Sequence, residues 1–217
     1  KALLEKILSV SQYDGCFLSP DEAMVTLDEN TLLVAVDTNR PDQVESKELL
    51  SAAGRVAVID HHRRAADYIE GALLNFHEPY ASSACELVTE LVQYLTERED
   101  VLPVETLSLL AGIVLDTKKF SVRTGARTFE AAAWLRKNGA DTVAVKLLFQ
   151  NDLHATLDRY EIIQHAALYR GNIAICCLDY TSDRIIAAQA ADELLNISGI
   201  QASFVFYPDG DRVICSA

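Results

Sequence analysis

The chain has 217 residues, of which half are apolar and 24% are charged, and its formal net charge is −13. This composition is typical of a globular protein with a sizeable core and excludes a disordered chain. The negative charge disfavours binding to duplex nucleic acid through a broad basic face, whereas a small anionic substrate needs only a few local cations. The five cysteines show no CxxC spacing, which favours a reducing cytoplasm over a disulfide framework or a structural zinc site. No apolar run reaches the ~18 residues of a membrane helix, so no membrane contact by this segment is expected.

The first half of the chain predicts a parallel sheet. Residues 1–8 have helical spacing. Residues 31–36 and 55–59 are short apolar runs rich in β-branched residues, and residues 41–53 between them have helical spacing. A strand, a helix and a strand of these lengths form a right-handed βαβ unit with parallel strands. Residues 73–76 are a candidate third strand.

Helices are expected to follow. Ser83 and Glu86 have the spacing of a capping box, which indicates a helix start. The predicted helices in this part are residues 82–98, 103–115, 127–137, 141–149 and 152–169.

The last segment has a different pattern, namely a strand at 172–178, a helix at 184–195, and strands at 202–207 and 212–215 after an Asp-Gly turn. The predicted fold class is therefore α/β. A parallel-sheet domain with flanking helices, residues 1–155, precedes a smaller β-α-β-β domain, residues 156–217. The first residue is not Met and the last predicted strand ends abruptly, so we expect a piece truncated at both ends.

Three apolar runs end in an aspartate: Asp37, Asp60 and Asp116. In open parallel sheets, ligands bind beyond the carboxyl ends of the strands. A single aspartate at such a position often serves only as a helix cap. Three in one domain, one of them followed by two histidines, favour a binding site.

Asp60-His61-His62 is the most informative tripeptide. Adjacent histidines point in different directions, so one can bind a metal while the other faces substrate, and a neighbouring carboxylate can fix the tautomer of a ring. The alternative is an ordinary surface loop. Carboxylates and imidazoles without a nearby thiolate suit Mn²⁺ or Mg²⁺, and two such ions can activate water for attack on a phosphoryl group.

Basic residues follow the candidate site. Those chosen as phosphate contacts are Arg63, Lys118, Arg123 and Arg127. Arginine and lysine can neutralise a phosphodiester. The alternative is a solvated face that balances the acidic surface. His77, His154 and His165 are interpreted as structural.

These residues lie in stretches that resemble the DHH phosphoesterase superfamily, and residues 37–141 are similar to cyclic-di-AMP phosphodiesterases of the GdpP type. The matching segments are residues 36–41 (VDTNRP), 58–64 (VIDHHRR), 78–91 (EPYASSACELVTEL) and 109–141 (LLAGIVLDTKKFSVRTGARTFEAAAWLRKNGAD). Residues 186–195 and 202–207 resemble the start of the DHH-associated domain of the same enzymes.

The resemblance implies a Mn²⁺-dependent hydrolysis of cyclic-di-AMP to linear pApA by two-metal activation of water. Asp37 would bridge two Mn²⁺ ions, and His61 and Asp116 would complete the protein ligands of the second ion. His62 would contact the phosphate, and Asp60 would support the histidines. The family also has an earlier motif with one His and two Asp, but residues 1–36 contain no histidine. This chain would therefore hold only part of the metal shell.

The resemblance further implies a cyclic dinucleotide as substrate, a possible homodimer, and a cytoplasmic segment of a membrane-anchored bacterial protein. Two alternatives remain open at this point. One is another DHH hydrolase, such as a phosphatase for short oligonucleotides or pAp, or a single-strand exonuclease, which the acidic charge disfavours. The other is a nucleotide-binding module without catalytic activity.

Overall fold

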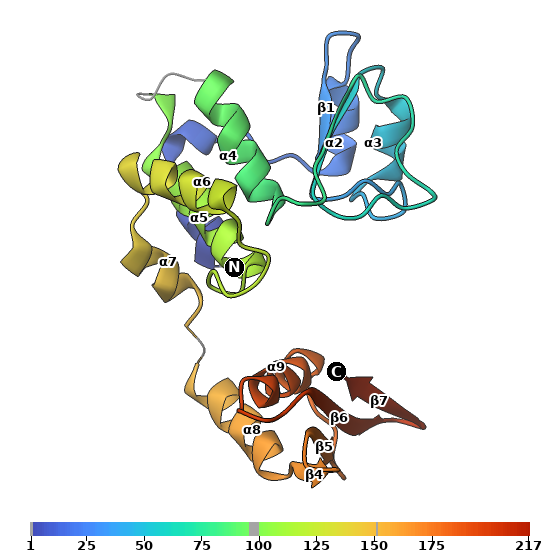
Figure 1. Cartoon of the computed structure of the whole chain (residues 1–217). Helices are drawn as coiled ribbons and strands as arrows, with labels where there is room; N and C mark the ends of the chain where they lie inside the picture. Colours follow the sequence, from blue (N-terminus) through green and yellow to red (C-terminus); the bar gives the residue numbers. More distant parts are fainter. Residues whose placement is uncertain (1, 96–99, 151) are drawn as a thin grey trace. The chain divides into compact units, whose positions relative to one another are not determined.

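The computed structural model describes residues 2–95, 100–150 and 152–217, and the chain divides into two compact units, residues 1–149 and 150–217 (Figure 1). The division lies before helix α8 (Leu153–Gln164), whereas the predicted boundary at residues 155 and 156 would cut through it. The difference arises because α8 packs against helix α9 (Arg184–Leu195), which places it with the second unit.

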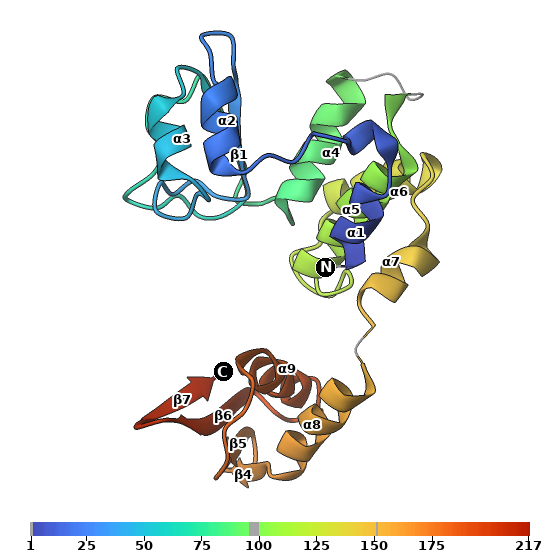
Figure 2. The same ribbon diagram turned by 180° about the vertical axis from the view of Figure 1, so that it is seen from behind.

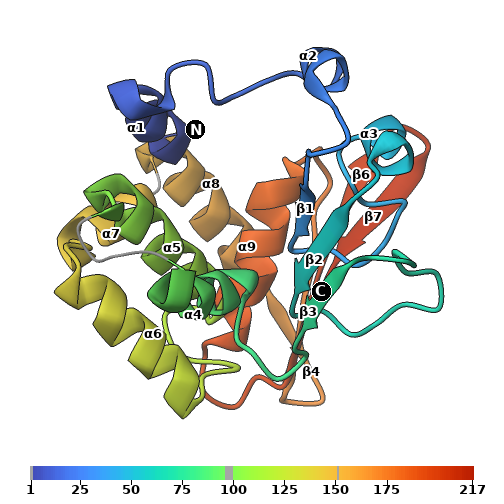
Figure 3. The same cartoon turned by 90° about the horizontal axis from the view of Figure 1, so that it is seen from above.

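The first unit contains a three-stranded parallel sheet, with strands β1 (Leu33–Val36), β2 (Val56–Asp60) and β3 (Leu74–His77) in that order. Figure 3 shows the three strands side by side. Helix α3 (Lys47–Ala52) connects β1 to β2, so the predicted βαβ unit and the third strand are confirmed.

Helix α3 is shorter than the predicted helix over residues 41–53. Ser46 caps it by accepting a hydrogen bond from the Leu49 N–H at 3.1 Å. Because this cap fixes the start of the helix at Ser46, residues 41–45 remain in turns and bends, where the Asp42 carboxylate binds the exposed Arg40 side chain at 2.6 Å.

Helices make up most of the rest of the first unit. Figures 1 and 2 show α1 beside α5, and α4 to α7 grouped together. The remaining helices of the first unit are α1 (Ala2–Leu8), the 3₁₀ helix η1 (Ser11–Tyr13), α2 (Pro20–Thr26), α4 (Ala84–Leu95), α5 (Pro103–Asp116), α6 (Ala126–Lys137) and α7 (Thr142–Leu148).

Two buried clusters connect these elements. One joins the sheet to α4 through Ile59, Ala81 and Leu87. The other joins α5, α6 and α7, and fully buries Ile113 and Leu135. Since α4 contacts both the sheet and α5, it fixes the position of α5 relative to the carboxyl end of the sheet.

Helix α4 begins close to where the sequence predicts. The Ser83 hydroxyl accepts a hydrogen bond from the Glu86 N–H at 3.0 Å, which is one half of a capping box. The Glu86 carboxylate instead accepts from the Ser82 hydroxyl at 2.6 Å, and both side chains are buried. The predicted end of this helix, at residue 98, lies outside the described residues.

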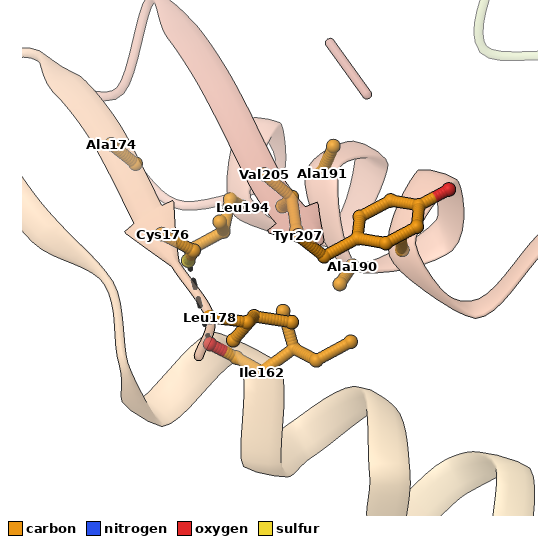
Figure 4. Close-up of a cluster of buried hydrophobic side chains, with 10 residues drawn as sticks. Ile162, Ala174, Cys176, Leu178, Ala190, Ala191, Leu194, Val205 and Tyr207 are labelled. Atoms are coloured by element: carbon orange, nitrogen blue, oxygen red, sulfur yellow. Dashed lines mark hydrogen bonds between the residues drawn. The ribbon is translucent and has the colours of Figure 1, made fainter. Parts of the chain in front are cut away.

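The second unit has a four-stranded mixed sheet in the order β4-β5-β6-β7. Helices α8 and α9 pack together, and the core around Ile162, Cys176, Leu194 and Val205 lies between these helices and the sheet (Figure 4). The strands are β4 (Ala167–Tyr169), β5 (Ile173–Cys177), β6 (Ala202–Asp209) and β7 (Arg212–Ser216).

Strand β4 corrects the predicted helix over residues 152–169, which ends at Gln164. Arg170 and Gly171 both have positive φ, 52° and 81°, and form a tight turn that folds β4 back onto β5 in antiparallel pairing. The apolar spacing of this segment fits both a helix and a strand, and tertiary pairing decided for the strand. Among the described residues, no helix has the length and apolar character needed to cross a membrane.

Candidate metal centre

The carboxyl ends of β1 and β2 lie at the same edge of the parallel sheet. Val36 pairs with Ile59, and the Asp37 N–H donates to the Ile59 carbonyl at 2.9 Å, so the ladder continues to Asp37. Asp37 then adopts a φ of 64°, in the left-handed region, which turns the chain away from the strand. Strained backbone of this kind is often found at functional sites, and here the carboxylate is 59% exposed.

His61 lies between two carboxylates. Its Nε2 is 3.3 Å from Asp37 Oδ1 and 3.8 Å from Asp116 Oδ2, and its side chain is only 5% exposed. Asp116 is the last residue of α5. The structure therefore brings together Asp37, His61 and Asp116, the three predicted metal ligands, which are far apart in sequence.

Asp116 shows the electrostatic cost of this arrangement. Burial raises the pKa of its carboxyl above the usual range; His61 lowers the pKa and the Asp37 carboxylate raises it. A cation between Asp37 and Asp116 would relieve the repulsion between the two carboxylates. The donor set of carboxylate and imidazole also suits a hard or borderline divalent ion.

His62 approaches the same Asp37 carboxylate, with its Nδ1 3.9 Å from Asp37 Oδ1. Ligand atoms of Asp37, His61 and His62 all lie within 4.8 Å of one another, a spacing that could hold a metal ion. Asp37 is thus shared by both histidines, whereas Asp116 is joined to the group through its approach to His61. The residues present fit a divalent metal.

Asp60 holds His62. Its fully buried carboxylate accepts from the His62 backbone N–H at 3.2 Å and from the ring Nδ1–H at 2.8 Å. Burial alone would raise the pKa of Asp60, but hydrogen bonds from His62 and Asn39 outweigh burial, and the net shift is downward. Asp60 is therefore ionised, and its position supports the predicted role of orienting a histidine.

Asn39 and His77 are site neighbours that the sequence did not indicate. Asn39 donates to Asp60 from its side chain, and the His77 Nε2–H donates to the His62 carbonyl. The sequence signal for Asn39 is its position two residues after the predicted metal ligand Asp37. The sequence predicts only a structural role for His77. In the fold, His77 of β3 pairs with Asp60 of β2, a neighbour relation that depends on strand pairing.

The predicted phosphate contacts differ in their surroundings. Arg63, Lys118 and Arg123 are exposed, and Arg123 lies close enough to Asp116 to lower the pKa of that carboxyl. Lys118 and Arg123 have positive φ values, 45° and 49°, so the chain winds tightly beyond α5.

Arg127 is engaged in ion pairs. Its guanidinium forms two hydrogen bonds to Glu90, at 2.8 and 2.7 Å, and lies 3.6 Å from Glu78. These hydrogen bonds and charges raise its pKa above the ordinary value for arginine. Arg127 thus links α6 to α4, and a phosphate would have to share the guanidinium with Glu90.

Comparisons with known proteins place these features in context. The family model described as "DHH family, N-terminal domain" matches residues 2–115. The chain is 44% identical over 217 residues to the cyclic-di-AMP phosphodiesterase GdpP of Bacillus subtilis (strain 168), covering 98% of this chain and 33% of that protein. It is 41% identical over 216 residues to the cyclic-di-AMP phosphodiesterase PdeA of Listeria monocytogenes serotype 1/2a (strain 10403S), covering 99% of this chain and 33% of that protein. The chain thus spans about a third of the length of these relatives.

The fold also has a counterpart among solved structures. The crystal structure of an exopolyphosphatase-related protein from Bacteroides fragilis superposes with a TM-score of 0.75 at 17% identity, over 94% of this chain and 62% of that one. At this identity the likeness concerns the fold alone.

Proposed function

Because the chain belongs to the DHH family, a metal-dependent phosphoesterase family, we propose that it is part of a Mn²⁺-dependent phosphodiesterase that hydrolyses cyclic-di-AMP to linear pApA. The observation that supports this most directly is the convergence of Asp37, His61 and Asp116 beside a His62 held by Asp60. The relatives named as cyclic-di-AMP phosphodiesterases supply the substrate class.

In this proposal, Asp37, His61 and Asp116 would hold divalent metal, and Asp37 would be shared by two ions, a role that the resemblance to the DHH family implies. When bound, two such ions activate water and stabilise the leaving oxygen of a phosphoryl group. The chain's own residues position the substrate. His62, with Nδ1–H directed to Asp60, presents Nε2 to the phosphate, while Arg63, Lys118, Arg123 and Arg127 offset phosphate charge.

The balanced reaction is simple. One water adds to a phosphorus, the bond from that phosphorus to the 3′ oxygen breaks, and the 3′ oxygen takes a proton, which opens the ring and leaves a 5′-phosphate. We further propose that the parent protein is bacterial and membrane-anchored with this segment in the cytoplasm, that it forms a homodimer, and that residues 156–217 start a substrate-binding domain.

The test is hydrolysis of cyclic-di-AMP, cyclic-di-GMP and pApA with and without Mn²⁺, by the 217-residue chain and by a version extended upstream with its natural sequence. We expect slow turnover and weak Mn²⁺ binding by the 217-residue chain, because metal affinity depends on ligand count. We expect the extended version to cleave cyclic-di-AMP fastest. Preference for pApA would favour another DHH hydrolase, and nucleotide binding without turnover would favour a module that only binds.

The two histidines provide a second test. His61→Ala should lower both bound Mn²⁺ and rate in the extended version. His62→Ala should keep the metal and lower the rate by ~10²–10³-fold, the usual effect of losing one contact that stabilises developing charge. Metal content and turnover of both variants are the measurements. Loss of metal from His62→Ala but not from His61→Ala would exchange the two assignments.

A further inference from the structure

Asn39 is a buried polar side chain beside the centre. It is only 5% exposed and lies in the loop that follows Asp37. Both ends of its side-chain amide have partners. The Nδ2 group donates to Asp60 Oδ2 at 2.5 Å, and Oδ1 accepts from the Ala65 backbone N–H at 3.2 Å. The amide orientation is therefore determined by its hydrogen bonds, since a flip would break both.

These bonds join two loops that carry the centre. Asp60 and Ala65 lie 21 and 26 positions after Asn39. The Asn39 carbonyl also accepts from the Ile69 N–H at 2.8 Å. The loop after β1, which carries Asp37, is thus connected through one side chain to the loop after β2, which carries both histidines.

Each oxygen of the Asp60 carboxylate accepts hydrogen bonds from a different residue. Oδ1 accepts from His62, and Oδ2 accepts from Asn39. If Oδ2 had no donor, a buried carboxylate would lack one of its hydrogen bonds, and the group could rotate away from His62 to find another. The Asn39 amide therefore acts on His62 through Asp60.

The backbone of His62 is fixed separately. His77 Nε2–H donates to the His62 carbonyl from the adjacent strand. With the backbone held there, the remaining freedom of His62 is rotation of its ring and the choice of which nitrogen carries the proton. Both are determined by Asp60, which requires a proton on Nδ1.

We propose that Asn39 is a positioning residue that keeps the Asp60 carboxylate aligned on His62, so that the His62 ring carries its proton on Nδ1 and presents Nε2 to the phosphate. The statement about phosphate rests on the proposed function. The statement about the tautomer concerns this chain alone and can be tested without metal or substrate.

Asn39→Ala is the informative substitution, because it removes the donor facing Asp60 without adding charge. Asn39→Asp is the second variant. It keeps the size of the side chain and the acceptor for the Ala65 N–H, but its carboxyl group can share a proton with Asp60 and so restore the donor. Asn172→Asp is the matched control, since Asn172 donates to Gln201 in an exposed pair of the second unit. Thermal melts by circular dichroism identify variants that retain the fold.

The first measurement is ¹⁵N NMR of histidine-labelled, metal-free protein. In the wild-type chain and in Asn172→Asp we expect His62 to carry its proton on Nδ1. In folded Asn39→Ala we expect the proton to shift toward Nε2, and in Asn39→Asp we expect a smaller shift, because a shared proton can replace the missing donor. A His62 tautomer that is unchanged in Asn39→Ala would overturn the proposal, whatever the substrate of the enzyme is.

The second measurement is turnover in the upstream-extended version. Asn39→Ala should lower kcat by ~10–100-fold with nearly unchanged Mn²⁺ content, the size of effect typical of residues behind a metal site. In a His62→Ala background the same substitution should change kcat by less than about a factor of two, because its effect passes through His62. Equal losses in both backgrounds would show that Asn39 acts only through general stability and would refute the positioning role. Absence of turnover in the wild-type protein would count against the proposed function, while the tautomer result stands independently.

Discussion

Gly112 lies where α5 crosses α4, and it offers a sharp test of how the fold positions Asp116. A Cβ added at Gly112 would lie 2.2 Å from Cys85 Sγ and 3.1 Å from Cys85 Cβ. Asp116 is one helical turn further along α5, so any separation of the two helices at Gly112 moves Asp116 relative to His61. We expect Gly112→Ala both to destabilise the protein and to weaken metal binding.

The magnitude follows from two opposing effects. Replacing a helical glycine with alanine normally stabilises by about 1 kcal/mol. Forcing an extra carbon into a packed interface costs typically 1–3 kcal/mol, and a contact of 2.2 Å is far inside van der Waals range. The Cys85 sulfur must move, and Cys85 Cβ at 3.1 Å requires the facing helix to give by a few tenths of an ångström. Because the contact is so short, we expect the cost to lie near the upper end of this range and the net loss in the free energy of unfolding to approach about 2 kcal/mol.

Urea denaturation followed by circular dichroism measures the free energy of unfolding, and titration calorimetry measures Mn²⁺ affinity. Gly54→Ala is the matched control, since an added Cβ there meets nothing within 4 Å. Combining Gly112→Ala with Cys85→Ala removes the closest contact and should recover part of the loss, because the two positions share one clash. A Gly112→Ala variant as stable as wild type, with unchanged metal affinity, would refute the helix-crossing argument.

Three further predictions concern cysteine reactivity, acid stability and the arginines. Burial, together with the smaller effect of the nearby Asp116 and Asp37 charges, raises the pKa of the Cys85 thiol to about 11. At pH 8, iodoacetamide should therefore label the exposed Cys16, Cys177 and Cys215 well before Cys85, and mass spectrometry of the peptides measures this order. The pKa of Asp60 is below the ordinary 3.8, so its ionised form contributes stability that is present above pH 3.8 and is lost as the pH falls through the folded-state pKa. In Asp60→Asn, the free energy of unfolding should therefore depend less on pH in this acidic range. An unchanged pH dependence would contradict this prediction. Arg123→Leu should raise KM for the dinucleotide more than Arg127→Leu, since Glu90 already neutralises Arg127, and the reverse order would show that Arg127 leaves Glu90 for substrate.

Local sequence patterns predicted the main strands of the parallel sheet and the edge of the sheet at which the candidate metal centre lies. Short β-branched runs ending in Asp37 and Asp60 predict strands whose carboxyl ends coincide, because parallel strands joined by one helix must point the same way. The observed register of Val36 with Ile59 agrees. The order of β5, α9, β6 and β7 in the second unit could likewise be predicted, since apolar periodicity depends only on neighbouring residues.

Tertiary structure decided which groups meet. The Asn39 to Asp60 contact spans 21 positions and the Arg127 to Glu90 pair spans 37, and no local spacing encodes either. Strand β4 formed where a helix was predicted, and its backbone groups pair with β5, a partner that the local sequence does not reveal. The sequence thus determined which residue types form the centre and at which strand ends they lie. The partners of each carboxylate were set by tertiary packing, in which α4 contacts the sheet and α5 contacts α4, since hydrogen bonds and ion pairs depend on distances that only the folded chain defines.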